Sequence, residues 1–289
     1  MGDVIDTDIE YLRRWIGRSE VDTDEVTAGS AAALSATLDR HDRAPQHGDP
    51  LPPLWHWLYF LPKHRQSELG IDGHARLGGF LPPIPLPRRM YAGGRVAWQE
   101  PLRIGDTISR VSRIADVTAK EGRTGALIFV RVHHEISTRD RLAITEDQDI
   151  VYRPNPTAND PKPSIQRAPD RARWIREVQP DAVLLFRYSA LTFNGYRPHY
   201  DRRFALDVQG HPGLVVHGPL VATLLADLLR RNLPDVNLSQ FSFRAVRALF
   251  DTDSFFVCGQ PGEDGRTVRL WARAPDGALA VEATGTLGS

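Results

Sequence analysis

The feature that most limits the possible folds of this chain is a series of short, β-branched segments that occurs twice. The first series begins near Met90 and continues through Ile108–Val117, Ala126–Ile136 and Leu142–Tyr152. Apolar and polar residues alternate in each segment, which predicts strands with one buried face. Turn residues separate the segments, so the series is expected to be an antiparallel meander. The fold should therefore consist mainly of antiparallel sheet.

A second series of strands follows the clearest helix of the chain. That helix is predicted at Val215–Arg231, because its apolar positions form one wide face. The strands after it are expected at Phe241–Phe250, Ser254–Gln260, Val268–Ala274 and Leu279–Leu287. The two series also end alike, with Leu-Ala-Ile at residues 142–144 and Leu-Ala-Val at residues 279–281. Two copies of one unit are therefore favoured, although any two meanders share some of this similarity.

Helices and irregular segments are expected around the strands. Short helices are predicted at Ile9–Gly17 and Ala31–Leu38, and Ala182–Tyr188 begins the second unit. The stretch Asp49–Pro87 combines many Pro and Gly residues with Trp, Tyr and Phe. A long irregular segment with aromatic side chains is usually a packed functional loop or lid and seldom a linker. We therefore expect this stretch to pack on the fold, with its tryptophans in the core.

The boundary between the two units is predicted in a proline-rich segment. Pro154–Pro169 holds several prolines, an Asn-Asp pair and few apolar residues. Such a composition favours a connection over a regular element. The chain is therefore divided into a first unit at residues 1–160 and a second unit at residues 161–289.

Composition and charge exclude several classes of partner. The 289 residues include 36 Lys+Arg and 36 Asp+Glu, whereas a general binder of nucleic acid or membrane surfaces carries clustered excess cations. No apolar run approaches the roughly 20 residues of a membrane-spanning helix, and Met1–Asp6 lacks both parts of a secretory signal. The lone Cys258 cannot form an internal disulfide and fits a reducing compartment. We expect a cytoplasmic protein without nucleic-acid or membrane partners.

The residues that indicate chemistry lie in two phrases of the second unit. The phrase Tyr188–Asp201 is polar and aromatic and contains Gly and Pro, which predicts a structured loop. Asn194 and His199 lie five residues apart in this phrase, so that one turn can direct both at the same point. The phrase Pro212–Leu220 places a Gly-Pro pair at the start of the long helix. Free backbone N–H groups at a helix start can hold an oxyanion.

The two phrases resemble the active-site signature of the MaoC-like hydratase/dehydratase family. That signature is Asp-x-Asn-Pro-x-His-x-Asp, followed by His-Gly-x-Leu at the start of a central helix. The closer similarity, which includes the phrase Leu86–Thr107, is to a double hot-dog subfamily with mesaconyl-CoA and itaconyl-CoA hydratases and mitochondrial-type hydroxyacyl-thioester dehydratases. The resemblance implies an α+β, tandem (double) hot-dog fold, whose antiparallel sheets each wrap around a central helix.

Carried over residue by residue, the resemblance implies three catalytic groups. His199 takes the place of the catalytic histidine, and Gly218 that of the glycine whose N–H binds the thioester oxygen. Asn194 falls where most of the family has aspartate. The chain departs from the broad pattern at Asn194, Tyr196 and Arg197, where Asp, Asn and Pro are expected. Since an amide cannot act as a general base, Asn194 is expected to orient water.

Four nearby side chains are candidates for binding the substrate: Tyr188, Tyr196, Arg197 and His217. The two tyrosines fit core packing equally well. A buried, hydrogen-bonded role suits His217 better than proton transfer. Arg197 either pairs with a distal carboxylate of the substrate or supports the loop. Asp201, which matches the acid two residues after the histidine, is expected to hold the loop together.

The resemblance implies a hydro-lyase that adds or removes water across the C=C of an enoyl-thioester. The closest similarity suggests a short branched dicarboxylic acyl-CoA, with mesaconyl-CoA or itaconyl-CoA converted to citramalyl-CoA. A 3-hydroxyacyl-thioester dehydratase of fatty-acid synthesis and a non-catalytic acyl-CoA-binding hot-dog subunit are the alternatives. No metal or organic cofactor is expected. A double hot-dog completes a pseudo-dimer within one chain, so both monomer and homodimer remain open. The first unit is expected to be catalytically inert and to form one wall of the acyl tunnel.

Overall fold

The computed structural model describes residues 8–122, 125–155, 157 and 164–288. The predicted boundary between residues 160 and 161, the turn residues 123–124 and the start of the chain at residues 1–6 lie outside the described residues. None of the helices within the described ranges is both long and apolar enough to cross a membrane.

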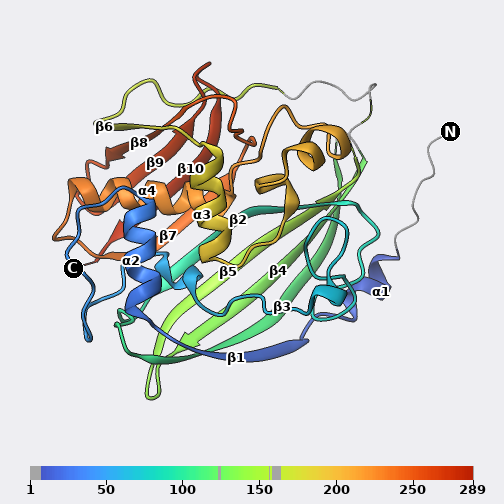
Figure 1. Cartoon of the computed structure of the whole chain (residues 1–289), viewed down its shortest axis with the longest axis horizontal. Coiled ribbons are helices and arrows are strands. Elements are labelled where there is room, and N and C mark those ends of the chain that lie inside the picture. Colours follow the sequence, from blue (N-terminus) through green and yellow to red (C-terminus); the bar gives the residue numbers. More distant parts are fainter. Residues whose placement is uncertain (1–7, 123–124, 156, 158–163, 289) are drawn as a thin grey trace.

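Ten strands in the described part of the chain form one sheet, in the order β1-β3-β4-β5-β2-β7-β10-β9-β8-β6 (Figure 1). The first half contributes β1 (Ser19–Glu25), β2 (Arg88–Trp98), β3 (Thr107–Gly122), β4 (Gly125–Ser137) and β5 (Leu142–Arg153). The second half contributes β6 (Trp174–Val178), β7 (Leu238–Ala245), β8 (Phe255–Pro261), β9 (Thr267–Arg273) and β10 (Leu279–Leu287). The neighbouring strands pair antiparallel, as predicted, and each half repeats the same order of strands.

The two halves of the sheet join where β2 pairs with β7. Gly93 of β2 lies opposite Arg244 of β7, and Gly94 lies opposite Phe243. A Cβ atom added to Gly93 would lie 2.4 Å from the carbonyl oxygen of Phe243. A side chain at this position would therefore push the two half-sheets apart, and glycine permits the close approach of the two backbones.

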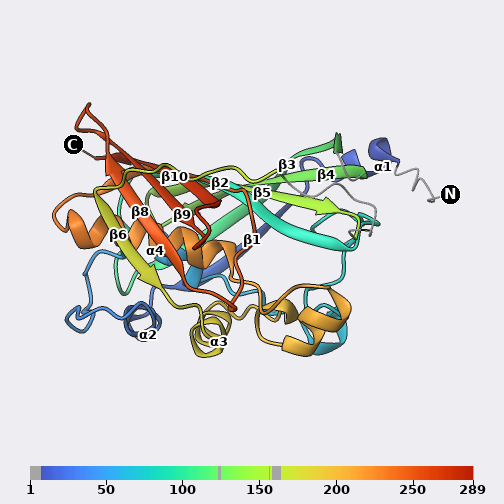
Figure 2. The same ribbon diagram turned by 90° about the horizontal axis from the view of Figure 1, so that it is seen from above.

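The helices lie mainly on one side of this sheet. The α-helices are α1 (Ile9–Arg13), α2 (Ala28–Thr37), α3 (Ala182–Leu191) and α4 (Gly218–Asn232). Short 3₁₀ or π turns form η1 (Trp55–Leu58), η2 (Gln66–Glu68), η3 (Arg197–His199) and η4 (Phe204–Val208). Figure 2 shows α2, α3 and α4 on the same side of the sheet, with α4 next to the strands. The face that they cover is called the inner face below.

Helix α4 forms the core of the second half. Its apolar side chains, including Leu220, Leu225 and Leu228, are buried against the strands β8, β9 and β10 and also against β2. Burial of one leucine side chain contributes roughly 1.5–3 kcal/mol, so this apolar face holds the helix on the sheet. The first half has no comparable helix among its described residues. There, α2 and the turns η1 and η2 occupy the connection between β1 and β2.

The aromatic stretch of the first half packs as predicted. Leu54, Trp55, Leu58 and Tyr59 are buried and belong to the same core cluster as the apolar face of α4. The guanidinium of Arg230 in α4 lies over the ring of Trp55, 5.6 Å from its centroid. Segment η1 therefore takes part in one continuous core that spans both halves.

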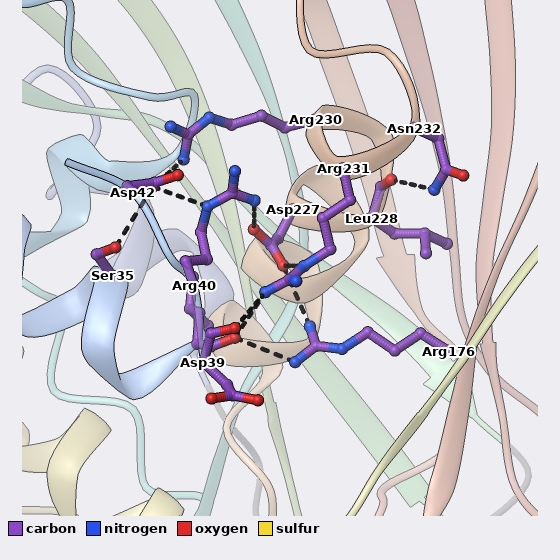
Figure 3. A network of polar contacts seen from close by, with 11 residues as sticks. Ser35, Asp39, Arg40, Asp42, Arg176, Asp227, Leu228, Arg230, Arg231 and Asn232 are labelled. Carbon is purple, nitrogen blue, oxygen red and sulfur yellow. Dashed lines mark hydrogen bonds and ion pairs between the residues drawn. The ribbon is translucent and has the colours of Figure 1, made fainter.

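The C-terminal end of α4 is tied to the first half by a buried carboxylate (Figure 3). Asp227 is 1% exposed and accepts hydrogen bonds from Arg40 at 2.6 Å, Arg176 at 3.1 Å and Arg231 at 2.6 Å. Arg176 and Arg231 also donate to the carbonyl oxygen of Leu38 at the end of α2. This Asp227 network holds the end of α2, strand β6 and helix α4 together.

Several predicted boundaries differ from the structure, including those of the long helix and of the strand that follows it. The helix predicted at Val215–Arg231 begins at Gly218, because the N–H of Val216 donates to the carbonyl of Leu249 in a separate chain segment. The strand predicted at Phe241–Phe250 is β7, which begins earlier and ends earlier. The residues expected at the end of this strand instead pair with the segment that precedes α4, where Phe250 lies opposite Val215.

Candidate active site

The loop after α3 begins with a tight helix end. Phe193 adopts a left-handed conformation with φ 48°, and the N–H of Asn194 donates to the carbonyl of Ser189 at 2.8 Å. This is a Schellman-type end, which reverses the direction of the chain. The side-chain oxygen of Asn194 then accepts from the N–H of Tyr196 at 3.0 Å, which forms a second turn. Two consecutive turns thus bring the short helix η3, and with it His199, back toward α3.

His199 is held as a neutral base. Its side chain is buried, and its Nδ1 lies 2.7 Å from the carbonyl oxygen of Val215. Because a carbonyl only accepts, Nδ1 must carry the hydrogen, and the lone pair is left on Nε2. Burial lowers the pKa of His199 to about 4, against an ordinary value of 6.5. Its imidazole is therefore uncharged near neutral pH and has a free acceptor nitrogen.

A second histidine lies directly against the first. The rings of His199 and His217 are stacked, with centroids 3.6 Å apart and planes inclined by 20°. His217 caps the start of α4, and its Nε2 lies 2.8 Å from the hydroxyl of Ser189. Burial, followed by the proximity of His199, holds the pKa of His217 well below its usual range. Nδ1 of His217 is buried and has no hydrogen-bond partner among the described residues.

Gly218 places a hydrogen-bond donor next to these rings. It is the first residue of α4, so its N–H has no acceptor within the helix, and Pro219 behind it has no N–H at all. The positive end of the helix dipole adds to this donor. A Cβ atom at Gly218 would lie 3.9 Å from the backbone oxygen and Cβ of Tyr91 in β2. The helix start therefore faces the first half of the sheet across a narrow space.

The predicted tyrosines also lie at this site. The edge of Tyr188 faces His217 at 5.0 Å, and the ring of Tyr196 meets His199 at 5.2 Å. Tyr196 stacks in turn on His74, with centroids 4.3 Å apart. These five residues form a continuous row of rings, which we call the ring row. It brings together the predicted residues Tyr188, Tyr196, His199 and His217, and adds His74.

Arg197 is bound both within its own loop and to the segment around Ile71. Its Nε and Nη2 donate to one oxygen of Asp201, and its Nη1 donates to the carbonyl of Ile71 at 3.0 Å. Its guanidinium also lies over the ring of Phe204, 4.1 Å from the centroid. Each guanidinium nitrogen thus has a partner, which favours loop support. Substrate binding by Arg197 stays a prediction.

The part of the first half that completes this site was not predicted from the sequence. The N–H of Arg197 donates to the carbonyl of Asp72 at 2.8 Å. Gly73 has φ 89°, and a Cβ atom there would lie 1.9 Å from the carbonyl oxygen of Gly195. The segment Gly70–Ala75 is therefore docked on the catalytic loop. Its sequence, Gly-Ile-Asp-Gly-His, contains two glycines and two polar residues within an aromatic stretch. This contrast is the signal from which a role at the site could have been predicted.

The arrangement combines a neutral base with an anion-binding donor. His199 offers a free Nε2, and Gly218 offers a backbone N–H at a helix start. Such a pair can take a proton from water and stabilise negative charge on a carbonyl oxygen. No group of three or more metal-ligating side chains occurs among the residues that the structure describes.

Two hollows elsewhere on the sheet contain none of these groups. One has a volume of about 480 Å³ and lies around Arg95, Arg244 and Arg269, and the other has about 420 Å³ and lies around His133 and Arg95. Charged side chains contribute to the lining of both hollows. Neither hollow has a base paired with a free helix N–H, so the ring row stays the candidate active site.

Comparisons with known proteins identify the family of the chain. The family model for hydroxyacyl-thioester dehydratase type 2 matches residues 54–251, a range that includes the phrases Tyr188–Asp201 and Pro212–Leu220. The chain is 48% identical to mesaconyl-C(4)-CoA hydratase of Chloroflexus aurantiacus, over 95% of this chain and 97% of the relative. It is 25% identical to the mitochondrial hydroxyacyl-thioester dehydratase type 2 of Schizosaccharomyces pombe, over 72% of this chain and 77% of the relative.

Solved structures support the fold. A MaoC-like dehydratase from Phytophthora capsici matches with a TM-score of 0.69 at 15% identity, over 98% of this chain and 99% of that chain. A Mycobacterium tuberculosis protein with a double hot-dog fold matches with a TM-score of 0.57 at 14% identity, over 94% and 96%. The predicted double hot-dog fold and the predicted hydro-lyase class are confirmed. One detail differs: the two half-sheets form one sheet, and the described residues of the first half have α2 and η1 where a second long central helix was expected. The chain belongs to the hydroxyacyl-thioester dehydratase type 2 family of MaoC-like hot-dog enzymes.

Proposed function

We propose that this enzyme hydrates a short, branched, dicarboxylic enoyl-CoA, with mesaconyl-C4-CoA converted to citramalyl-CoA and itaconyl-CoA as the related substrate. The observation that carries the chemistry is a neutral His199 with a free Nε2, stacked on His217, which directly precedes Gly218 at the start of α4. The identity to a mesaconyl-C(4)-CoA hydratase, over nearly the whole chain, supports this choice of acyl group.

In the proposed reaction, His199 acts first as base and then as acid. Its Nε2 takes a proton from water while the water oxygen bonds to the β-carbon of the C=C. Electrons then move onto the thioester oxygen, where the N–H of Gly218 stabilises the charge. The imidazolium returns its proton to the α-carbon, so one water is added in full. Since burial lowers the pKa of His199 to about 4, the imidazolium gives up this proton readily.

Asn194 is the proposed water-orienting group. Its side-chain oxygen is occupied by the N–H of Tyr196, and its amide nitrogen has no hydrogen-bond partner among the described residues. That nitrogen can donate to the oxygen of the attacking water. Tyr188, Tyr196 and His217 provide the walls that would exclude other water from the reacting atoms.

A dehydratase of 3-hydroxyacyl-thioesters is the second candidate. The similarity to the fission-yeast enzyme favours it, although the identity is lower and covers less of the chain. The proposed chemistry is the same in reverse, and only the acyl chain differs. A non-catalytic subunit is disfavoured, because contact with Val215 keeps His199 in the tautomer that a base needs.

Activity on a panel of acyl-CoA thioesters tests the proposal. Mesaconyl-C4-CoA, itaconyl-CoA, crotonyl-CoA and 2-octenoyl-CoA are incubated with purified enzyme, and the loss of enoyl-thioester absorbance and the products are followed. We expect the highest kcat/KM for a dicarboxylic substrate. A higher value for 2-octenoyl-CoA would favour the second candidate, and no turnover of any substrate would favour the non-catalytic alternative.

Location and assembly also remain proposals. We infer a cytoplasmic enzyme from the single, buried cysteine. One chain already joins both half-sheets through β2 and β7, so a monomer contains the paired unit. Light scattering of the purified protein would distinguish monomer from homodimer.

A further inference from the structure

Arg89 is a cation without a partner next to the active site. It is the second residue of β2 and is partly buried, yet it forms no hydrogen bond or ion pair with any residue that the structure describes. Its neighbour Arg88 donates to the carbonyl of Gln209, and Arg95 on the same strand forms an ion pair with Asp147. A guanidinium has five donors, and those that are withdrawn from water normally find acceptors.

The register of the sheet places Arg89 on the inner face. Arg89 lies opposite Tyr152 of β5, and Tyr91 lies opposite Ile150, with no irregularity between the two pairs. Tyr152 and Ile150 are both buried. Because alternate residues of a strand share one face, Arg89 and Tyr91 are on the same side, roughly 6.6 Å apart along the strand. Tyr91 lies against Gly218, so Arg89 lies one strand repeat beyond the proposed oxyanion site.

Electrostatic effects place Arg89 near the outer end of the ring row. Burial, and then the charge of Arg89, lowers the pKa of His74. Burial raises the pKa of Tyr152, and Arg89 opposes that change. The hydroxyl of Tyr152 is itself buried without a hydrogen-bond partner among the described residues. Asp72, another charged neighbour of Arg89, is already hydrogen-bonded to His74. An unpaired guanidinium and an unpaired hydroxyl therefore occupy the same region.

We propose that Arg89 binds the free carboxylate of the dicarboxylic acyl group and thereby determines the substrate specificity of this site. This inference rests on the proposed function. Arg89 lies one strand repeat beyond Tyr91, which itself lies against Gly218, and this spacing suits a four-carbon main chain between the thioester and the carboxylate. Arg197, the cation expected from the sequence, has its donors occupied by Asp201 and by the carbonyl of Ile71.

The position of Arg89 favours the acyl carboxylate, and not the phosphates of CoA, as the group that it binds. Arg89 lies beside the fully buried Tyr152 on the inner face of the sheet, beyond the proposed reaction centre. The phosphates of CoA are highly hydrated and belong at the entrance of a site. Arg–carboxylate pairs also form two parallel hydrogen bonds, which fixes the orientation of the acyl group.

The kinetic test compares two substrates in Arg89→Gln, Arg89→Lys and a matched control. Hydrogen bonds to a charged group contribute about 1.5–3 kcal/mol. We therefore expect Arg89→Gln to lower kcat/KM for mesaconyl-C4-CoA by about 10- to 150-fold, and for crotonyl-CoA by less than about threefold. Arg89→Lys should retain part of the preference. The control Arg95→Gln removes a cation from the same strand, on the opposite face, and should change neither value.

A binding test separates this inference from the proposed function. Succinyl-CoA and butyryl-CoA have the same main-chain length and do not react, and calorimetry gives their Kd values. The wild type should bind succinyl-CoA more tightly, and Arg89→Gln should lose that preference. Equal losses for both ligands would assign Arg89 to the phosphates of CoA and overturn the inference, as would no loss for either. If the wild type hydrates no dicarboxylic substrate, the proposed function fails, while the binding preference still decides the role of Arg89.

Discussion

The two halves of the molecule cover the inner face of the sheet in different ways. In the second half, α4 lies on the strands with a continuous apolar face. In the first half, the short turn η1 lies there and is attached through polar contacts to Glu146 of β5. Nε2 of His56 lies 3.0 Å from this carboxylate, Nε1 of Trp57 donates to it at 3.0 Å, and the hydroxyl of Tyr91 donates to it at 3.1 Å.

The pKa of Glu146 shows how the polar contacts of the first half act on a buried carboxylate. Burial alone would raise its pKa, but the hydrogen bond and charge of His56, with further help from Trp57, lower the pKa to about 2. A buried carboxylate is therefore retained in its charged form. Apolar packing does not depend on direction, whereas hydrogen bonds do. The first half thus holds Tyr91 in a defined place against Gly218, and the second half contains the proposed base, His199, and the start of α4.

The first prediction tests whether the chemistry belongs to the second half. His199→Ala should lower kcat by about 100- to 10,000-fold, because general acid–base catalysis is lost. Its thermal unfolding should remain cooperative. The matched control is His133→Ala in the first half, where the ring is bonded to Asp147 on the outer face, and it should keep wild-type kcat. A folded His199→Ala variant with more than about a third of wild-type kcat would remove His199 from the mechanism.

The second prediction tests whether polar contacts hold η1. Glu146→Ala leaves buried donors of His56, Trp57 and Tyr91 without an acceptor, so we expect a loss of about 3–5 kcal/mol in the free energy of unfolding. Denaturant titration measures this loss. Glu135→Ala on the neighbouring strand, where the side chain is 53% exposed, should change stability by less than about 0.5 kcal/mol. Similar effects in both variants would mean that the cluster around Glu146 is not needed to hold η1.

The third prediction concerns the contact between the halves at Gly73. Gly73→Ala adds a Cβ atom 1.9 Å from the carbonyl of Gly195, so the catalytic loop must move. Displacement by about 1 Å costs roughly 100-fold in rate, and we expect a fall in kcat of that order. Gly48→Ala has the same backbone strain, with φ 86°, but nothing within 4 Å of the new atom. Equal kcat values for the two variants would show that the docked segment does not position the loop.

The fourth prediction distinguishes the two halves by the pH range in which a key residue of each half loses its contribution to stability. The pKa of His199 is about 4 when folded and near 6.5 when unfolded, so the unfolded chain binds more protons between these values. The contribution of His199 to the free energy of unfolding is therefore fully present above pH 6.5. It is lost as the pH falls toward 4, by at most about 1.4 kcal/mol per pH unit. The corresponding loss from Glu146, whose pKa is lowered from 4.5 to about 2, begins only below pH 4.5.

Denaturant titration from pH 7 to pH 3 measures both effects. His199→Ala should flatten the dependence between pH 6.5 and 4, whereas Glu146→Gln should flatten it only at lower pH. In the wild type, the acid limb of kcat/KM should lie near pH 4 if His199 is the base of the free enzyme. An acid limb near 6.5 would contradict a buried, neutral His199.

Much of the fold was predictable because its signals are local. The meander strands of both halves and helix α4 carry clear apolar periodicity, and the structure has them close to the expected bounds. The edge strands β1 and β6 were missed. Strand β1 has the sequence Ser-Glu-Val-Asp-Thr-Asp-Glu and is largely exposed, and among the described strands it pairs only with β3. A charged edge strand avoids aggregation but loses the alternation by which strands are recognised.

Local sequence was enough to predict which residues of the second half could act together. Asn194, His199 and Gly218 lie in one loop and one helix start, and their local turns follow from Gly, Pro and Asn in those phrases. What lies opposite them depends on the fold of the whole chain. His74, Arg89 and Tyr91 are more than 100 positions away in the sequence. They reach the site through the register of β2 against β5 and β7, and through the close backbone approaches at Gly73 and Gly93. Periodicity and turn propensity act over a few residues, whereas strand register and loop docking depend on the packing of the whole chain.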